Sequence, residues 1–223
     1  MQLFGQTGPN GPVGDGVQVP FRQGRYADQI VSELQGRFYE ACYRGMLFSN
    51  GCSLTALTAN TITLTNTTTP ILGLWNPSTS TVNAVVLQAA LDITINNLTN
   101  GAGPGAFVWA TSIGNTVAPT TGVKGFSRKA LATAGSQVQG MSFAALTGIT
   151  NNLVVLEGAD FPAPSGLTYG TFPATAVIPV YNGVQNFDGN LIVPPGGILA
   201  LLNTVSSTLW SVAGRLLWAE VNI

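Results

Sequence analysis

The acidic residues are the main candidates for acid–base chemistry in this chain, because the sequence contains no histidine. Glu157 and Asp160 stand three residues apart in LEGADF, and a pair of carboxylates is what a glycoside hydrolase needs. Asp160 and Asp188, together with loop carbonyls, could instead bind Ca²⁺, which prefers oxygen ligands. A single pair of this kind more often solvates a turn, and no acidic ligand spacing repeats along the chain. The pattern therefore favours a structural role for these acids.

The motifs of the common enzyme classes are missing. Without histidine the chain cannot form a Ser-His-Asp triad, a Cys-His pair or a histidine metal site. The GPVGDG stretch at 11–16 resembles part of a phosphate loop, but no strand precedes it and no Lys-Ser/Thr follows it. For Cys42 and Cys52, ten residues apart, we expect two free thiols, with a disulfide across a hairpin as the alternative. We predict that the protein is not an enzyme and holds no cofactor and no metal.

Charge is scarce and unevenly placed. Asp, Glu, Lys and Arg make up 8% of the residues, against about 25% in typical soluble domains. Between Gly45 and Val123, Asp92 is the only formally charged side chain. Ions are depleted at the cores of interfaces because removing them from water is costly. The long uncharged stretch therefore predicts that much of the surface faces other subunits.

The same composition argues against two classes of partner. The net charge is −1, and the basic cluster of Lys124, Arg128 and Lys129 more often marks a solvated loop than a binding site. No run of about 18 apolar residues indicates a membrane-spanning helix. We therefore expect no nucleic-acid partner and no membrane.

Aromatic residues at strand spacing are the remaining candidates for a binding site. Exposed on one face they could stack on sugar rings, but at this spacing they more often pack in a core, which is the interpretation we favour. The residues concerned are Trp75, Trp109, Trp210, Trp218, Tyr169 and Tyr181.

The elements that position these residues begin with an arm. Residues 1–24 are rich in Gly, Pro and Gln and show no apolar period, so they predict an extended N-terminal arm without a core of its own. Val17, Val19 and Phe21 alternate, which suits an arm added to a sheet or laid in a groove of a neighbouring subunit.

The charged segment that follows the arm allows two interpretations. Apolar residues recur every four positions from Tyr26, as on a helix, and a helix at 26–35 stays open. The aromatic content and the alternation of the second half favour two strands instead, Gln29–Glu33 and Arg37–Phe48, joined by a turn at LQGR.

The rest of the chain, residues 25–223 with that segment included, predicts one antiparallel β-sandwich of jelly-roll-like form, in an all-β fold. In the longest strand, 82–98, alternation places Val85, Leu87, Ala89, Leu91, Ile93 and Ile95 on one face. Loops are expected over 114–150, with a short helix near 128–134. Further strands are expected near 60–66, 106–113, 153–158 and 207–223. Residues 70–81 predict a strand that ends in an Asn-Pro turn, and residues 190–203 predict a strand, a tight turn and a second strand.

Several of these stretches resemble structural proteins of tailed bacteriophages. The first matches a motif of the type G-R-[FY]-[FY]-E-A-x-x-R-G-x-x-[FY]-S, carried here by Gly36, Arg37, Phe38, Tyr39, Glu40, Ala41, Arg44, Gly45, Phe48 and Ser49. A Leu-x-Asn-Pro turn at 74–77 follows, and the last strand carries Trp218 and Glu220. The resemblance implies a virion protein, usually a homotrimer, that decorates or cements a capsid and binds its own copies and the major capsid protein or other virion proteins. A fibre or a receptor- or carbohydrate-binding module of the virion is the alternative.

The resemblance also suggests a role for the charged segment. Arg37, Glu40 and Arg44 are expected to form charge-assisted pairs that set the register between subunits. Together with Val17, Val19 and Phe21 of the arm, they are the residues predicted at the subunit interface.

Overall fold

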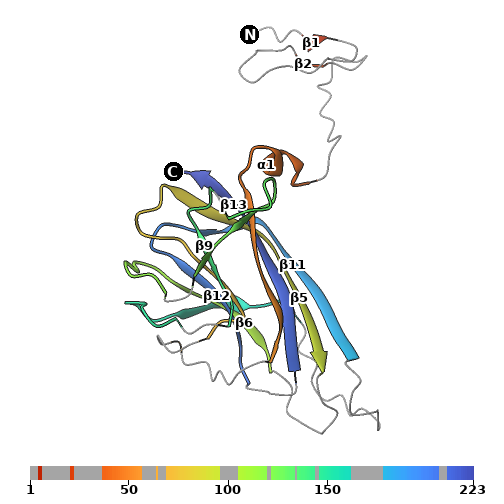
Figure 1. Ribbon diagram of the computed structural model, residues 1–223, viewed down its shortest axis with the longest axis vertical. Helices are drawn as coiled ribbons and strands as arrows, with labels where there is room; N and C mark the ends of the chain where they lie inside the picture. The colour runs from red at the N-terminus through yellow and green to blue at the C-terminus, as the bar shows by residue number, and fades with distance from the viewer. Residues whose placement is uncertain are drawn as a thin grey trace. The chain divides into compact units, whose positions relative to one another are not determined.

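Figure 1 shows the fold as a computed structural model. The chain divides into two compact units, Met1–Glu40 and Ala41–Ile223. In the first unit, β1 (Gly5–Gln6) and β2 (Phe21–Arg22) form a parallel pair. The predicted arm boundary at residue 24 lies outside the residues that the structure describes, which are 5–6, 21–22, 37–56, 64, 69–95, 105–119, 122–133, 135–143, 146–161, 178–205 and 210–223.

The second unit is an antiparallel β-sandwich, as the sequence predicted. Its five-stranded sheet has the order β11-β5-β13-β3-β8 (Figure 1). The strands of this sheet are β3 (Leu47–Ala56), β5 (Val82–Ile95), β8 (Phe126–Ser127), β11 (Ile178–Val193) and β13 (Trp210–Asn222).

The second sheet has six strands in the order β10-β6-β12-β4-β9-β7. These are β4 (Leu72–Trp75), β6 (Phe107–Ser112), β7 (Val123–Lys124), β9 (Gln139–Met141), β10 (Val154–Gly158) and β12 (Ile198–Asn203). No helix among the described residues is both long and apolar enough to span a membrane.

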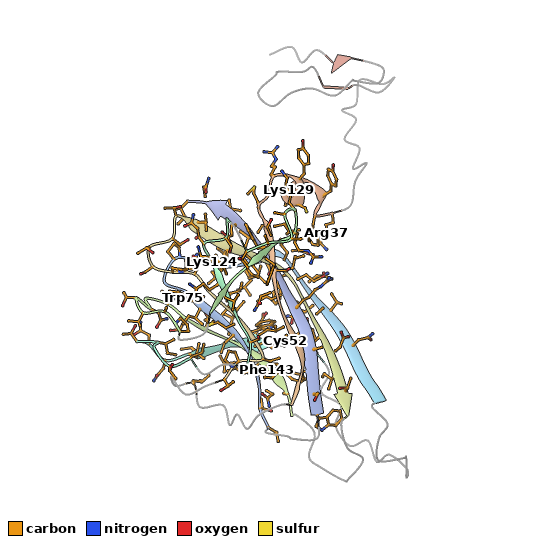
Figure 2. The ribbon with its side chains drawn as sticks, in the orientation of Figure 1. Arg37, Cys52, Trp75, Lys124, Lys129 and Phe143 are labelled. Atoms are coloured by element: carbon orange, nitrogen blue, oxygen red, sulfur yellow. The ribbon has the colours of Figure 1, made fainter. Side chains whose placement is uncertain are left out.

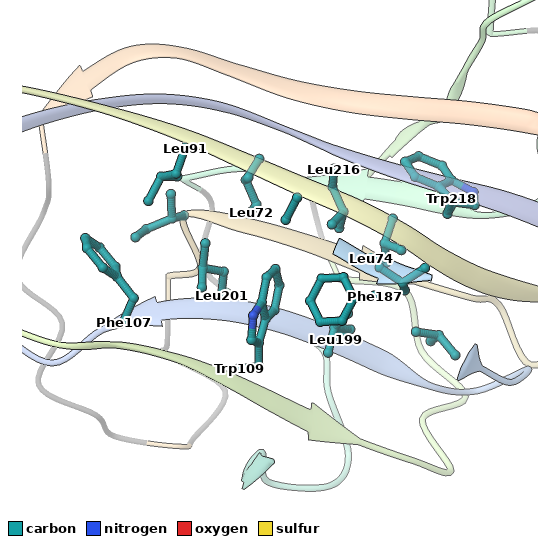
Figure 3. Packing of buried hydrophobic residues seen from close by; sticks show 14 of the residues in the cluster. Leu72, Leu74, Leu91, Phe107, Trp109, Phe187, Leu199, Leu201, Leu216 and Trp218 are labelled. Atoms are coloured by element: carbon teal, nitrogen blue, oxygen red, sulfur yellow. The ribbon is translucent and has the colours of Figure 1, made fainter. Parts of the chain in front are cut away.

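The core lies between the two sheets. Leu91 and Leu216 of the five-stranded sheet pack with Leu72, Trp109 and Leu201 of the six-stranded sheet, and all five side chains are fully buried (Figure 3). Burial of this apolar surface is the main force that holds the sheets together, at about 25 cal/mol for each Å² removed from water.

A second apolar cluster lies on the opposite face of the six-stranded sheet. Ile198 and Ala200 of β12 pack there with Leu146, Ile149 and Leu153 from the segment that precedes β10. Both faces of β12 are therefore covered, which explains why its first five residues, ILALL, are continuously apolar.

The core face predicted for the strand at 82–98 is correct in one half of β5 and wrong in the other. Ala89, Leu91 and Ile93 point into the core as expected. In the first half the buried residues are instead Val82, Ala84 and Val86. Along β13, Leu217 pairs with Gln88 and Trp218 with Val86, so the residue between them is a β-bulge that exchanges the two faces.

The strand predicted at Arg37–Phe48 is wrong. A helix, α1 (Tyr39–Tyr43), occupies its centre, and β3 begins only at Leu47. Gly45, with a φ of 75°, ends the helix, and the Met46 amide donates to the Ala41 carbonyl at 2.9 Å. This six-to-one hydrogen bond across a left-handed glycine is a Schellman cap, which only a helical segment can make.

The predictions for the remaining helices and strands have different outcomes. The short helix near 128–134 is wrong in the described part, where residues 128–133 form turns and Leu131 has a φ of 54°. The strand predicted at 29–33, the helix predicted at 26–35 and all but Leu64 of the strand predicted at 60–66 lie outside the described residues. The strands predicted within 70–81, 106–113, 153–158 and 207–223 are confirmed as β4, β6, β10 and β13. The two strands predicted within 190–203 are confirmed as the end of β11 and as β12.

Candidate functional site

The residues predicted at a subunit interface fall into two groups. Val17 and Val19 lie outside the described residues, and Phe21 lies in β2, where its backbone pairs with that of Gly5. Arg37, Glu40 and Arg44 fall within the turn–helix–turn segment around α1. Their part in a subunit contact stays a prediction.

Cation–aromatic contacts surround this segment. The guanidinium of Arg37 lies 5.3 Å from the centre of the Phe38 ring, and the ammonium of Lys129 lies 5.1 Å from the centre of the Tyr43 ring. Figure 2 labels both cations, Arg37 and Lys129. Tyr39 and Tyr43 are 46% and 59% exposed. Each contact is worth about 0.5–1 kcal/mol at an exposed site, so these cations are partly held in place.

Glu220 is the centre of a buried polar network that joins the two sheets. Its carboxylate is buried and accepts hydrogen bonds from the Ser136 hydroxyl at 2.6 Å and the Gln137 amide at 2.9 Å. The Val138 amide at 3.4 Å and Trp218 Nε1 at 3.3 Å are further donors. We call these five residues the Glu220 joint, because they fasten the segment before β9 to the last strand of the other sheet.

Gly125 completes the same region. It lies between β7 and β8, where the chain passes from the edge of the six-stranded sheet to the edge of the five-stranded sheet. A Cβ at this position would lie 2.3 Å from Cζ2 of Trp218. Only glycine therefore fits against the buried indole, and the crossing segment closes this side of the sandwich.

Two buried asparagines hold other loops. Asn76, in the predicted Leu-x-Asn-Pro turn, donates from its side chain to the carbonyls of Val82 and Val193. The side chain of Asn115 donates to Ser112 and accepts from the amide of Asn151. These side-chain amides add to the backbone hydrogen bonds of the same loops, which is a structural role.

The acids singled out in the sequence do not form a catalytic or metal centre in the described part of the chain. Glu157 lies on the exposed strand β10, and Asp160 is exposed just after it. The described residues contain no group of three or more His, Cys, Asp or Glu side chains placed to hold a metal ion.

The tryptophans are core residues, as the strand spacing favoured. Trp109 and Trp218 are fully buried, and Trp75 and Trp210 are 5% and 6% exposed. The Nε1 of Trp109 donates to Gln185 at 2.8 Å. Tyr169 and the side chain of Tyr181 lie outside what the structure describes.

Both cysteines are free, and the prediction of two thiols is confirmed. Burial raises the pKa of the Cys52 thiol from its ordinary value of 9.0 to about 11, and hydrogen bonds with the backbone offset part of this rise. Because the folded pKa lies above the unfolded one, the stability contributed by this thiol is complete below pH 9 and is lost as the pH rises toward 11.

This pKa predicts slow modification of Cys52. At pH 8 only about one thiol in a thousand would be ionised, and the thiolate is the reactive form. In a Cys42→Ala chain we expect iodoacetamide to label native Cys52 at least about tenfold more slowly than the urea-unfolded chain, as followed by mass spectrometry. Equal labelling rates would contradict the burial of this side chain.

Exposed apolar side chains gather on one edge strand. In β10, Val154, Val155 and Leu156 are 64%, 43% and 46% exposed, and the strand pairs with β6 on one side only among the described residues. Alternation in a strand predicts that every second side chain is buried. The sequence pattern LVVLEG therefore gave no sign that three consecutive apolar side chains are exposed. The Glu220 joint was likewise missed, although Trp218 and Glu220, two residues apart on one face of a strand, were a visible signal.

Similarity to known proteins does not assign this chain to a family. Comparison with models of protein families, with curated proteins and with solved structures finds no match for this chain.

Proposed function

We propose that this chain is a structural protein that works as an assembly of its own copies, and more specifically a homotrimeric decoration or cement protein of a bacteriophage capsid, located in the virion. The exposed edge strand β10 carries the proposal. Proteins usually protect sheet edges with charge, proline or a covering segment, because an open apolar edge pairs with other chains. Among the described residues β10 pairs on one side only, and it exposes Val154, Val155 and Leu156 instead.

Composition and the buried polar groups support the same proposal. A chain with 8% charged residues keeps less ionic surface in water than a typical soluble domain. The Glu220 joint and the two buried asparagines stiffen loops, which suits a protein whose task is to keep its shape under load. The expected partners are further copies of the chain, and the major capsid protein or other virion proteins.

A fibre or a receptor- or carbohydrate-binding module of the virion is the second candidate. The exposed rings of Tyr39 and Tyr43 favour it, since sugars stack on exposed aromatic faces. It has less support, because the four tryptophans are buried in the core.

Light scattering coupled to size-exclusion chromatography tests the proposal. We expect the full-length protein to have the mass of three chains. When Val155 and Leu156 are both changed to lysine, we expect the mass to fall toward that of one chain, because the charged side chains keep the edge strand in water. Val221→Lys, a change at a 40% exposed valine on β13, is the matched control and should leave the mass unchanged. A single-chain mass at every protein concentration would remove the basis of the proposal. Mass spectrometry of purified virus particles tests the assignment to the virion.

A further inference from the structure

The charged side chains of the sandwich are separated by sign. The unit Ala41–Ile223 contains five acidic and five basic residues, and all of them lie in the described part of the chain. Glu220 is buried in its joint, and the other nine are exposed. Where these nine lie on the two sheets determines what the surface can bind.

The exposed acids lie toward the side where β10 and β11 form the sheet edges. Glu157 is on β10, and Asp160, just after it, donates its amide to Gln185 of β11. Asp188 is on β11 itself, and Asp92 is on the adjacent strand β5. We call Asp92, Glu157, Asp160 and Asp188 the acidic edge.

The exposed bases lie toward the opposite side, where β7 and β8 form the edges. Lys124 is on β7, Arg128 directly follows β8, and Lys129 contacts the ring of Tyr43 (Figure 2). Arg44 precedes β3, the strand that pairs with β8. We call Arg44, Lys124, Arg128 and Lys129 the basic edge; the fifth base, Arg215, lies on the central strand β13.

Each edge also exposes apolar side chains. Val154, Val155 and Leu156 of β10 lie on the acidic side. On the basic side, Val123 of β7 and Phe126 of β8 are 52% and 47% exposed. Each edge thus combines an apolar strand with charges of one sign, which is the composition of an interface with an apolar centre and a polar rim.

We propose that copies of this chain associate side by side, with the acidic edge of one copy against the basic edge of the next. The inference rests on the proposed assembly function and specifies its geometry. A second copy fits because the two complementary surfaces belong to one chain. A two-fold pairing of like edges would place the four acids of one copy opposite the four acids of the other, which is unfavourable. A contact between different surfaces of the same chain forms a ring when its rotation closes, and a homotrimer is such a ring.

Charge reversal on each edge tests this geometry. The variant E157K/D160K removes the net negative charge of the acidic edge, because the two lysines offset Asp92 and Asp188. The variant K124E/R128E removes the net positive charge of the basic edge, because the two glutamates offset Arg44 and Lys129. Each alone should weaken self-association about tenfold or more, as measured by sedimentation equilibrium of the full chain. The four substitutions combined in one chain exchange the signs at these four positions, so they should restore the attraction between them and with it association. Arg215→Glu is the matched control, since it reverses an exposed charge away from both edges.

The outcomes separate this inference from the proposed function. If the wild-type chain stays monomeric, both the side-by-side geometry and the proposed assembly function are wrong. The same holds if the chain binds only a different protein through its acidic edge. If the wild type assembles and the two edge variants assemble equally well, the geometry proposed here is wrong while the assembly function stands. Loss in the edge variants without recovery in the combined variant also overturns it, because a side-by-side contact must regain its complementarity. Thermal unfolding of each variant verifies that the sandwich is folded, and the neutral pairs E157Q/D160N and K124Q/R128Q give the same comparison if a reversed variant unfolds.

Discussion

Replacing Glu220 by alanine is expected to lower the free energy of unfolding by about 4 kcal/mol. The substitution removes the acceptor for four donors: the Ser136 hydroxyl, the amides of Gln137 and Val138, and Trp218 Nε1. A buried donor left without a partner costs about 1–3 kcal/mol, and the small alanine side chain also leaves a cavity. For a chain of this length the change corresponds to a fall in Tm of about 10 °C, measurable by calorimetry or circular dichroism.

Two variants control this prediction. Glu220→Gln keeps the size of the side chain and one acceptor oxygen, so it should lower the free energy of unfolding by less than the alanine change does. It should still lower it, because the amide NH2 group would face donors and cannot accept from them. Glu157→Ala removes an exposed carboxylate on β10 and should change the free energy of unfolding by about 0.5 kcal/mol or less. Similar losses in Glu220→Ala and Glu157→Ala would show that the buried network does not hold the sheets.

Replacing Gly125 by alanine is expected to lower the free energy of unfolding by about 3 kcal/mol. The added Cβ would lie 2.3 Å from Cζ2 and 2.7 Å from Cη2 of Trp218, and 3.1 Å from Oγ of Ser136. Trp218 is fully buried and stacks against Phe48 with a ring separation of 6.4 Å, so the indole cannot swing aside. The crossing segment must therefore move, which strains the Glu220 joint as well.

Gly158→Ala is the matched control for this prediction. Gly158 is exposed on β10, and a Cβ there would meet nothing within 4 Å. We expect its free energy of unfolding to stay within about 0.5 kcal/mol of the wild type in urea titrations. If Gly125→Ala has the same free energy of unfolding as Gly158→Ala, the segment at Gly125 does not pack closely on Trp218 in solution.

The joint and the proposed assembly are connected through the chain. Gly125 separates Lys124 on β7 from Phe126 on β8, and both of these residues belong to the side that we propose to meet a second copy. A loosened joint would displace the charged and apolar groups of this side together. Gly125→Ala should therefore weaken self-association as well as stability, whereas the edge-charge variants should weaken association alone.

Regular strands with strong local patterns were predictable. The expected strands at 106–113 and 207–223 differ from β6 and β13 by at most three residues at either end. Turn residues flank these strands, and alternating apolar residues line the core face of β13. The free thiols and the buried tryptophans were also predicted, because both follow from composition and strand spacing.

The errors arise from two features that local residue patterns do not record. One is contact between residues distant in sequence, and the other is the geometry of a single turn. Alternation across Phe38–Arg44 suggested a strand, but a Schellman cap at Gly45 selects a helix. Alternation along β5 continued through Leu87, but the pairing of Val86 and Gln88 with β13 requires a bulge there. Neither feature changes the local pattern of residue types on which the prediction depended.

Residue types and their order were sufficient to specify an all-β sandwich, strands such as β5, β6 and β13, its apolar core and its low content of charged residues. Each of these depends on near neighbours in the sequence or on average composition. Three partners of Glu220 lie more than 80 residues away in the chain. These partners, the space left by Gly125 and the separation of charges to opposite edges were specified by the folded arrangement alone. The reason is that strand order brings distant segments to one edge or one joint, and no local pattern records which strands will become neighbours.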